Sequence, residues 1–101
     1  MSQDQVTVTI AKDLEDLIPV FIKNRGKEIE SLRSALTGGD LEQLRQIGHR
    51  MKGVGSSYGF DAISDFGKQV EDSARGEDRA AVEACIARYA DYLARVRVVY
   101  E

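Results

Sequence analysis

The sequence lacks the residues and runs that mark several large classes of protein. With one cysteine and one histidine among 101 residues, it can form no internal disulfide and offers no familiar set of metal ligands. No apolar stretch approaches the roughly 20 residues that a membrane-spanning helix needs. The net charge is −3, and no stripe of Lys and Arg with interleaved aromatics appears, so neither a membrane nor nucleic acid is an expected partner. We expect no metal and no cofactor.

The single cysteine, the N-terminal residues and the overall composition indicate where the protein is located and how many domains it has. A lone cysteine, Cys85, suits a reducing compartment, and the polar, acidic start MSQDQ is unlike a signal peptide, so a cytoplasmic protein is expected. Apolar residues make up 43% and charged residues 31% of the chain, which suits a folded domain rather than a disordered one. Residues 1–101 are interpreted as a single domain, and a monomer is expected.

From residue 13 onward, apolar residues recur at helical spacing along most of the sequence. Pro19 is tolerated in a first helical turn, a Gly-Gly pair stops a helix, and Asp40 and Asp78 are good caps for the helices that follow them. Gln43, three residues after Asp40, matches a capping box. After a short lead-in, the expected helices span about 19–36, 41–57 and 60–75, and Asp78 begins a fourth.

Four amphipathic helices with short connections predict an all-α fold, an up-down-up-down antiparallel four-helix bundle. Two segments alternate as strands do, Val6–Ile10 and Val96–Tyr100, and an up-down bundle brings its two ends together. A small two-stranded pairing of the termini is one interpretation. Continuation of the last helix through the second segment is the other.

The one histidine lies on the second expected helix. At about 100° per residue, the apolar side chains of this helix cluster on one side, and His49 points roughly 150° away from them, toward solvent. Arg45 lies one turn before it, Lys52 one turn after it, and Ser56 two turns after it. The histidine is therefore predicted to be a surface residue with cations beside it.

Three glycines, Gly48, Gly53 and Gly55, interrupt the same helix, although each costs roughly 0.8–1 kcal/mol against alanine. Gly48 and Gly55 lie toward the core, where they would let a neighbouring helix approach closely. Gly53 lies on the outer face, one turn from His49, and clears space there. A flat surface around an exposed imidazole indicates a docking site for a partner that must reach the ring.

A neutral imidazole is a good nucleophile near neutral pH, because its unperturbed pKa is about 6.5. Attack on a phosphoryl group gives a phosphoramidate that passes the group on readily. Such transfer needs mainly positioning and cations on the phosphoryl oxygens, which Arg45 and Lys52 can supply. No Gly-rich ATP-binding loop is present, so the phosphoryl group would come from another protein, and the chain is not expected to be an enzyme with its own turnover.

The segment from His49 to Gly59, HRMKGVGSSYG, resembles the motif of the histidine-containing phosphotransfer (HPt) domain family. That motif is H-x-x-K-G, then a small residue two positions later and a glycine four after that. The likeness extends to Asp40 before the second helix and to Glu71 in the third. One departure is Val54, where many members have Ser or Ala; the helical wheel turns it toward the core edge, so we interpret it as a packing residue.

The resemblance implies that His49 is phosphorylated on the nitrogen remote from the backbone and that Glu71 holds the other ring nitrogen. It also implies that Lys52 stabilises the phosphoryl oxygens and that Gly53 leaves room for a receiver domain. By their spacing, Lys68, Glu71 and Arg75 are predicted to share the polar flank of the third helix. The complete candidate site is His49, Lys52 and Glu71 for the chemistry, with docking or phosphoryl-stabilising positions at Arg45, Gly53, Ser56, Lys68 and Arg75.

The sequence thus predicts a phosphocarrier of a two-component phosphorelay. It would take a phosphoryl group from a histidine kinase or a receiver aspartate and pass it to a receiver domain. Two alternatives stay open: an adaptor that binds a receiver or kinase without being phosphorylated, and a phosphatase that acts on receiver aspartyl phosphate.

Overall fold

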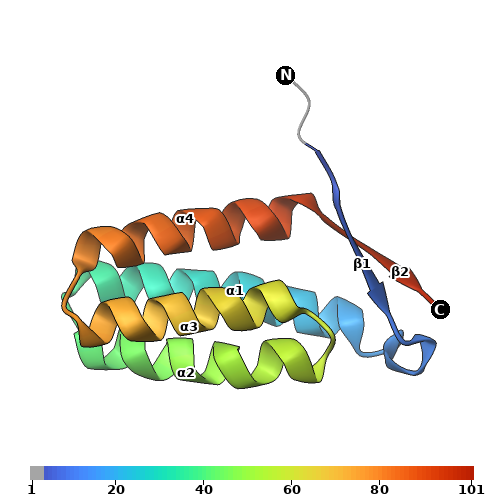
Figure 1. Ribbon diagram of the computed structural model, residues 1–101, viewed down its shortest axis with the longest axis horizontal. Coiled ribbons are helices and arrows are strands. Elements are labelled where there is room, and N and C mark those ends of the chain that lie inside the picture. The colour runs from blue at the N-terminus through green and yellow to red at the C-terminus, as the bar shows by residue number, and fades with distance from the viewer. Residues whose placement is uncertain (1–3) are drawn as a thin grey trace.

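The computed structural model describes residues 4–101 as a helical bundle with a small sheet at one end (Figure 1). Its elements are β1 (Val6–Ile10), the 3-10 turn η1 (Lys12–Leu14), α1 (Ile18–Thr37), α2 (Leu41–Ser57), α3 (Asp61–Arg75), α4 (Arg79–Arg95) and β2 (Val96–Tyr100). Around the bundle, α1 contacts α2, α2 contacts α3, α3 contacts α4, and α4 contacts α1. The predicted up-down-up-down four-helix bundle is confirmed.

The helix ends follow the local chemistry of the sequence. Asp40 Oδ1 accepts a hydrogen bond from the backbone N–H of Gln43 at 3.0 Å, and Asp78 caps α4 in the same way. Gly39 and Gly59 adopt φ values of 70° and 88° in the turns before α2 and α3, a left-handed conformation that glycine adopts without strain. These turns reverse the chain and set α2 antiparallel to both of its neighbours.

The core lies between the helices and includes the one cysteine. Cys85 is fully buried, and its thiol lies 3.5 Å from the carbonyl oxygen of Phe66. Tyr89 is also fully buried, and its hydroxyl donates to Glu28 at 2.8 Å, so its polar end is paired. The largest fully buried side chains are Tyr89, Phe60, Ile10, Leu32, Leu44, Ile47, Met51, Ile63, Val70, Val82 and Cys85.

The two chain ends pair as a parallel two-stranded sheet, with Val6 opposite Val96 and Ile10 opposite Tyr100. The strands can be parallel because the whole bundle forms the crossover between them. Every second side chain turns toward the bundle, and Ile10 is buried against the α2–α3 turn, where a Cβ on Gly59 would lie 2.9 Å from it. The interpretation of paired termini is therefore correct, and the alternative of a longer last helix is wrong.

Candidate functional site

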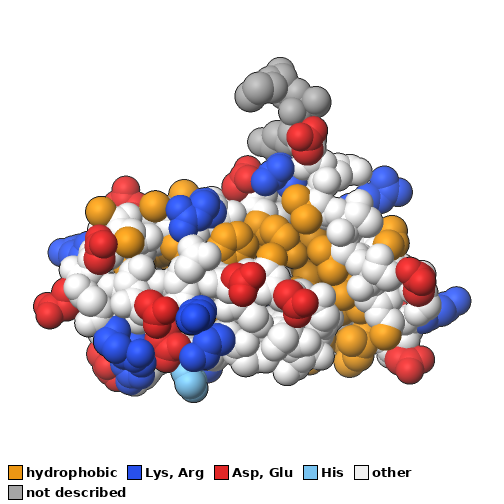
Figure 2. Space-filling view, in the orientation of Figure 1, with side chains coloured by type: hydrophobic (Ala, Val, Ile, Leu, Met, Phe, Trp, Pro, Cys, Tyr) orange, Lys and Arg blue, Asp and Glu red, His pale blue; other side chains and the backbone are white. Residues whose placement is uncertain are grey.

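His49 lies on the outer face of α2, as its position on the helical wheel predicts. Its side chain is 65% exposed. Figure 2 shows the ring at the rim of the molecule beside a group of charged side chains, whereas the apolar surface visible in that view lies toward α4 and the terminal sheet. The imidazole is thus open to a partner that approaches α2 from outside.

The inner face of α2 packs against α3 through glycines. A Cβ on Gly48 would lie 2.7 Å from both Glu71 N and Gly67 O, and a Cβ on Gly55 would lie 2.6 Å from Ser64 N. Gly67, on α3, meets α2 in the same way, with a Cβ position 2.5 Å from Lys52 N. The predicted close approach is confirmed, and Gly67 is a partner in it that the sequence analysis missed. Its signal was a glycine in mid-helix on the apolar side.

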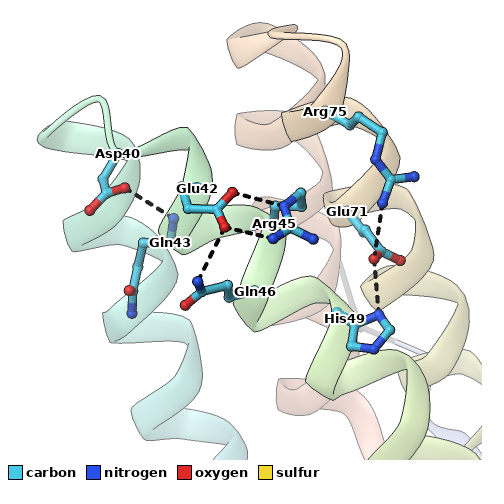
Figure 3. Close-up of polar contacts among 8 residues, drawn as sticks. All are labelled: Asp40, Glu42, Gln43, Arg45, Gln46, His49, Glu71 and Arg75. Atoms are coloured by element: carbon cyan, nitrogen blue, oxygen red, sulfur yellow. Dashed lines mark hydrogen bonds and ion pairs between the residues drawn. The ribbon is translucent and has the colours of Figure 1, made fainter.

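This close approach brings Glu71 of α3 under His49. Glu71 Oε2 lies 3.0 Å from His49 Nδ1 and 3.4 Å from Arg75 Nη2 (Figure 3). The other oxygen, Oε1, lies 2.8 Å from Lys52 Nζ. The Glu71 side chain is only 4% exposed. The prediction that it lies on a polar flank was therefore wrong for Glu71, because the glycines bring the two helices close enough to cover the carboxylate.

The surrounding cations decide the charge of this buried carboxylate. The hydrogen bond from Lys52 and then the contact with His49 hold the pKa of Glu71 below its usual value, against the opposing effect of burial. An ionised carboxylate only accepts hydrogen bonds, so the proton in this contact belongs to His49 Nδ1, and in the neutral ring Nε2 is the nitrogen with the lone pair. In Figure 3 the second ring nitrogen is turned away from Glu71. The ring therefore presents a nucleophilic nitrogen to solvent.

The other two predicted cations, Arg45 and Lys68, differ in whether they form an ion pair with a carboxylate. Arg45 donates to Glu42 through Nε at 2.9 Å and Nη2 at 2.6 Å, and together with Gln46 it lowers the Glu42 pKa to about 2. Lys68 is exposed, and within residues 4–101 it makes no ion pair. Arg45 is thus oriented along its own helix, whereas Lys52 and Arg75 converge on Glu71.

Two small residues shape the surface after the histidine. Nothing lies within 4 Å of a Cβ placed on Gly53, so this glycine is not required by packing inside the domain. Ser56 is exposed, and its backbone N–H donates to Ser64 Oγ of α3 at 2.7 Å, which secures the last turns of α2. The surface beside His49 is therefore open at Gly53, and the backbone that follows is held to α3.

The site thus combines an exposed histidine on the outer face of a helical bundle with a buried carboxylate in contact with its ring. The family model for the Hpt domain matches residues 11–98, and the chain therefore belongs to the Hpt domain family. No curated protein and no solved structure matches the chain with significance. In the part of the chain that the structure describes, no helix is long and apolar enough to cross a membrane, and no group of three or more His, Cys, Asp or Glu residues could hold a metal ion.

Proposed function

We propose that this protein is a phosphocarrier of a two-component phosphorelay, with His49 as the residue that is phosphorylated. The observation that carries the proposal is the contact of His49 Nδ1 with Glu71 Oε2 at 3.0 Å on an otherwise exposed ring. This contact keeps one nitrogen protonated and leaves the other free to attack. Membership in the Hpt family, whose domains carry phosphoryl groups between kinases and receivers, supports the same proposal.

The transfer from a receiver is a simple displacement at phosphorus. The lone pair of His49 Nε2 attacks the phosphorus of a receiver aspartyl phosphate, an N–P bond forms, and the P–O bond to the aspartate breaks to leave its carboxylate. The reverse step returns the phosphoryl group to a receiver. When the donor is a kinase with bound ATP, the bond to the γ-phosphoryl group breaks instead and ADP leaves. The receiver supplies its own aspartate and Mg²⁺.

Within this chain, we assign to Lys52 the role of neutralising the phosphoryl oxygens. Its ammonium group lies one turn from His49 and is about half exposed, so it can exchange part of its contact with Glu71 for a phosphoryl oxygen. Arg75, on α3, approaches the same carboxylate and can hold Glu71 when Lys52 moves. Arg45 is paired with Glu42 and is a weaker candidate for this role.

The direct test is radiolabelled phosphotransfer with the histidine kinases and receivers of the same cell, using the wild-type protein and His49→Gln. Acid-labile label should appear on the wild type and be absent from His49→Gln, which should unfold at nearly the same urea concentration because the ring is exposed. Label on the variant would remove His49 from its role.

The same assay separates the two alternatives. Faster release of phosphate from a labelled receiver, with no label on this protein, would identify a phosphatase. Binding to a receiver or kinase with neither label nor faster release would identify an adaptor.

A further inference from the structure

The sheet formed by the two chain ends has only two strands, so within residues 4–101 each strand has one unpaired edge. Figure 1 shows this sheet at one end of the bundle. A strand edge presents a row of N–H and C=O groups that can pair with another strand, and proteins usually cover or charge such edges. The free edges of β1 and β2 are therefore two surfaces on which a further strand could pair.

The hydrogen bonds at the end of the sheet identify the groups on the free edge of β2. Glu101 N–H donates to the carbonyl oxygen of Ile10 at 3.1 Å, and Glu101 C=O accepts from Lys12 N–H at 3.0 Å. Because peptide groups point to alternate sides along a strand, the odd-numbered residues of β2 face β1. Val98 and Tyr100 therefore direct their N–H and C=O groups to the free edge, and no backbone hydrogen bond outside the sheet uses these groups within residues 4–101.

The outer face of β2 carries a pattern of side chains that is symmetric about Val99. Arg97 precedes Val99 by two residues and Glu101 follows it by two, and all three residues are exposed. Val99 is one of three exposed large apolar residues in the described chain, at 36%. A strand with a basic residue at one end, an acidic residue at the other and an apolar residue between them is complementary to an antiparallel copy of itself.

The two charges of this pattern are not paired inside the domain. Within residues 4–101, Arg97 and Glu101 form no ion pair, and Arg97 makes only a long contact of 3.4 Å with Gln5 Oε1. The free edge of β1 differs, because its outward side chains, Thr7 and Thr9, carry no charge. The β2 edge is therefore the one with a defined complement, which is a second copy of this chain.

We propose that the β2 edge is a homodimer interface, in which two copies join their sheets into one sheet of four strands. The two β2 strands run antiparallel about a twofold axis at Val99, so that Arg97 lies opposite the partner's Glu101. In this register Val98 and the partner's Tyr100 exchange two backbone hydrogen bonds, and the twofold axis repeats them. The interface is small, and small interfaces are typical of weak, transient association.

The proposed dimer leaves the histidine of each copy open. In Figure 2 the histidine lies at the rim, away from the terminal sheet. The inference goes beyond the proposed phosphocarrier function and does not rest on it. Wild type and every variant below should therefore take label from phosphoramidate, a small phosphoryl donor that needs no docking, at the same rate.

Sedimentation equilibrium of the wild-type protein measures the association. A dilution series from about 1 mM to about 10 µM covers the range of weak binding. The average mass should rise with concentration toward that of two chains. A constant mass of one chain across the series, which is the monomer expected from the sequence, would overturn the proposal.

Arg97→Glu and Glu101→Arg test the register. Each variant alone places like charges opposite one another at two positions, so each should weaken association about tenfold. An equimolar mixture of the two should recover the wild-type association, because a chain with two acidic residues then pairs with a chain with two basic ones. Arg33→Glu, the same change at an exposed position of α1, is the matched control and should have no effect. Equal association of all variants, or a mixture no stronger than either variant alone, would overturn the register.

Hydrogen exchange followed by NMR tests the backbone pairing. The amides of Val98 and Tyr100 should exchange several-fold more slowly in concentrated than in dilute solution, because they become bonded to the partner. The amides of Thr7 and Thr9, on the other free edge, are the matched control and should not change with concentration. Slowing at Thr7 and Thr9 alone, or no change at either edge, would overturn the pairing through β2.

Discussion

The inner and outer faces of α2 use glycine for opposite purposes. On the inner face, Gly48 leaves no room for a side chain, because a Cβ would lie 2.7 Å from the α3 backbone. On the outer face, Gly53 has nothing within 4 Å, so any side chain would fit inside this domain. The first glycine is explained by the fold. The second is explained only by something outside the chain, which is why it supports a docking surface.

The comparison also explains how a surface histidine acquires a buried partner. The glycine contact brings α3 so close that Glu71 is covered while its carboxylate still reaches His49 at the rim. A longer distance between the helices would leave Glu71 in water, where a single hydrogen bond to the ring contributes little. The inner face thus sets the chemistry, and the outer face sets access to it.

The largest effect is expected from Gly48→Ala. The added Cβ must push α2 from α3, so we expect the free energy of unfolding to fall by about 2–3 kcal/mol. The displaced helix should also break the contact between His49 and Glu71. Urea unfolding and phosphoramidate loading measure the two effects. Unchanged stability would mean that the helices are less closely packed than this account requires.

The next largest effect is expected from Lys52→Ala. Loss of one charge-assisted contact with the phosphoryl oxygens should slow both loading and back-transfer about ten- to hundredfold, since such a contact contributes roughly 1.5–3 kcal/mol. Lys68→Ala is the matched control and should change these rates little. If Lys68→Ala has the larger effect, the cation that serves the site comes from α3 instead.

A smaller effect is expected from Glu71→Gln. The amide keeps an acceptor oxygen but loses the charge, so the ring is held less firmly and loading should slow several-fold. Because the folded-state pKa of Glu71 is lowered from 4.5, the ionised carboxylate stabilises the fold above that pH, and this contribution is lost as pH falls through the lowered pKa. Urea midpoints at about pH 6 and about pH 3 should therefore differ less in Glu71→Gln than in the wild type. Equal pH dependence would show that the folded protein does not lower this pKa.

The smallest effect, and one of opposite sign, is expected from Gly53→Ala. Alanine at this exposed helix position should raise the free energy of unfolding by about 0.8–1 kcal/mol. Gly53→Leu should also keep or raise stability, yet slow transfer to the receiver, because its side chain stands where the partner docks. Transfer by Gly53→Leu at the wild-type rate would remove the reason for a glycine at this position.

The sequence was sufficient for the features that depend on local periodicity and caps. Helical spacing, the caps Asp40 and Asp78 and the glycine stops predicted the bundle, and the wheel placed His49 outside and Gly48 inside. The same wheel failed for Glu71, because it reports direction around one helix and not the distance to the next one. That distance depends on Gly48 and Gly67 together, a pairing across two helices that single-helix periodicity does not contain.

Contacts between distant segments were beyond the sequence for similar reasons. Alternation predicted that the segments Val6–Ile10 and Val96–Tyr100 were strand-like, but it left pairing and helix continuation open, since so short an apolar run does not separate the period of a strand from that of a helix. One local contact was missed as well. Arg45 pairs with Glu42 at i, i+3, a spacing that is visible in the sequence, but Arg45 was interpreted only as a phosphoryl ligand.

The central claim is that Glu71 holds Nδ1 of His49 and so directs phosphorylation to Nε2. The most direct measurement is ¹⁵N NMR of the imidazole before and after loading with phosphoramidate. We expect a protonated Nδ1 in the free protein and a phosphoryl group bonded to Nε2 in the loaded one. A phosphoryl group on Nδ1, or a free ring that carries its proton on Nε2, would contradict it.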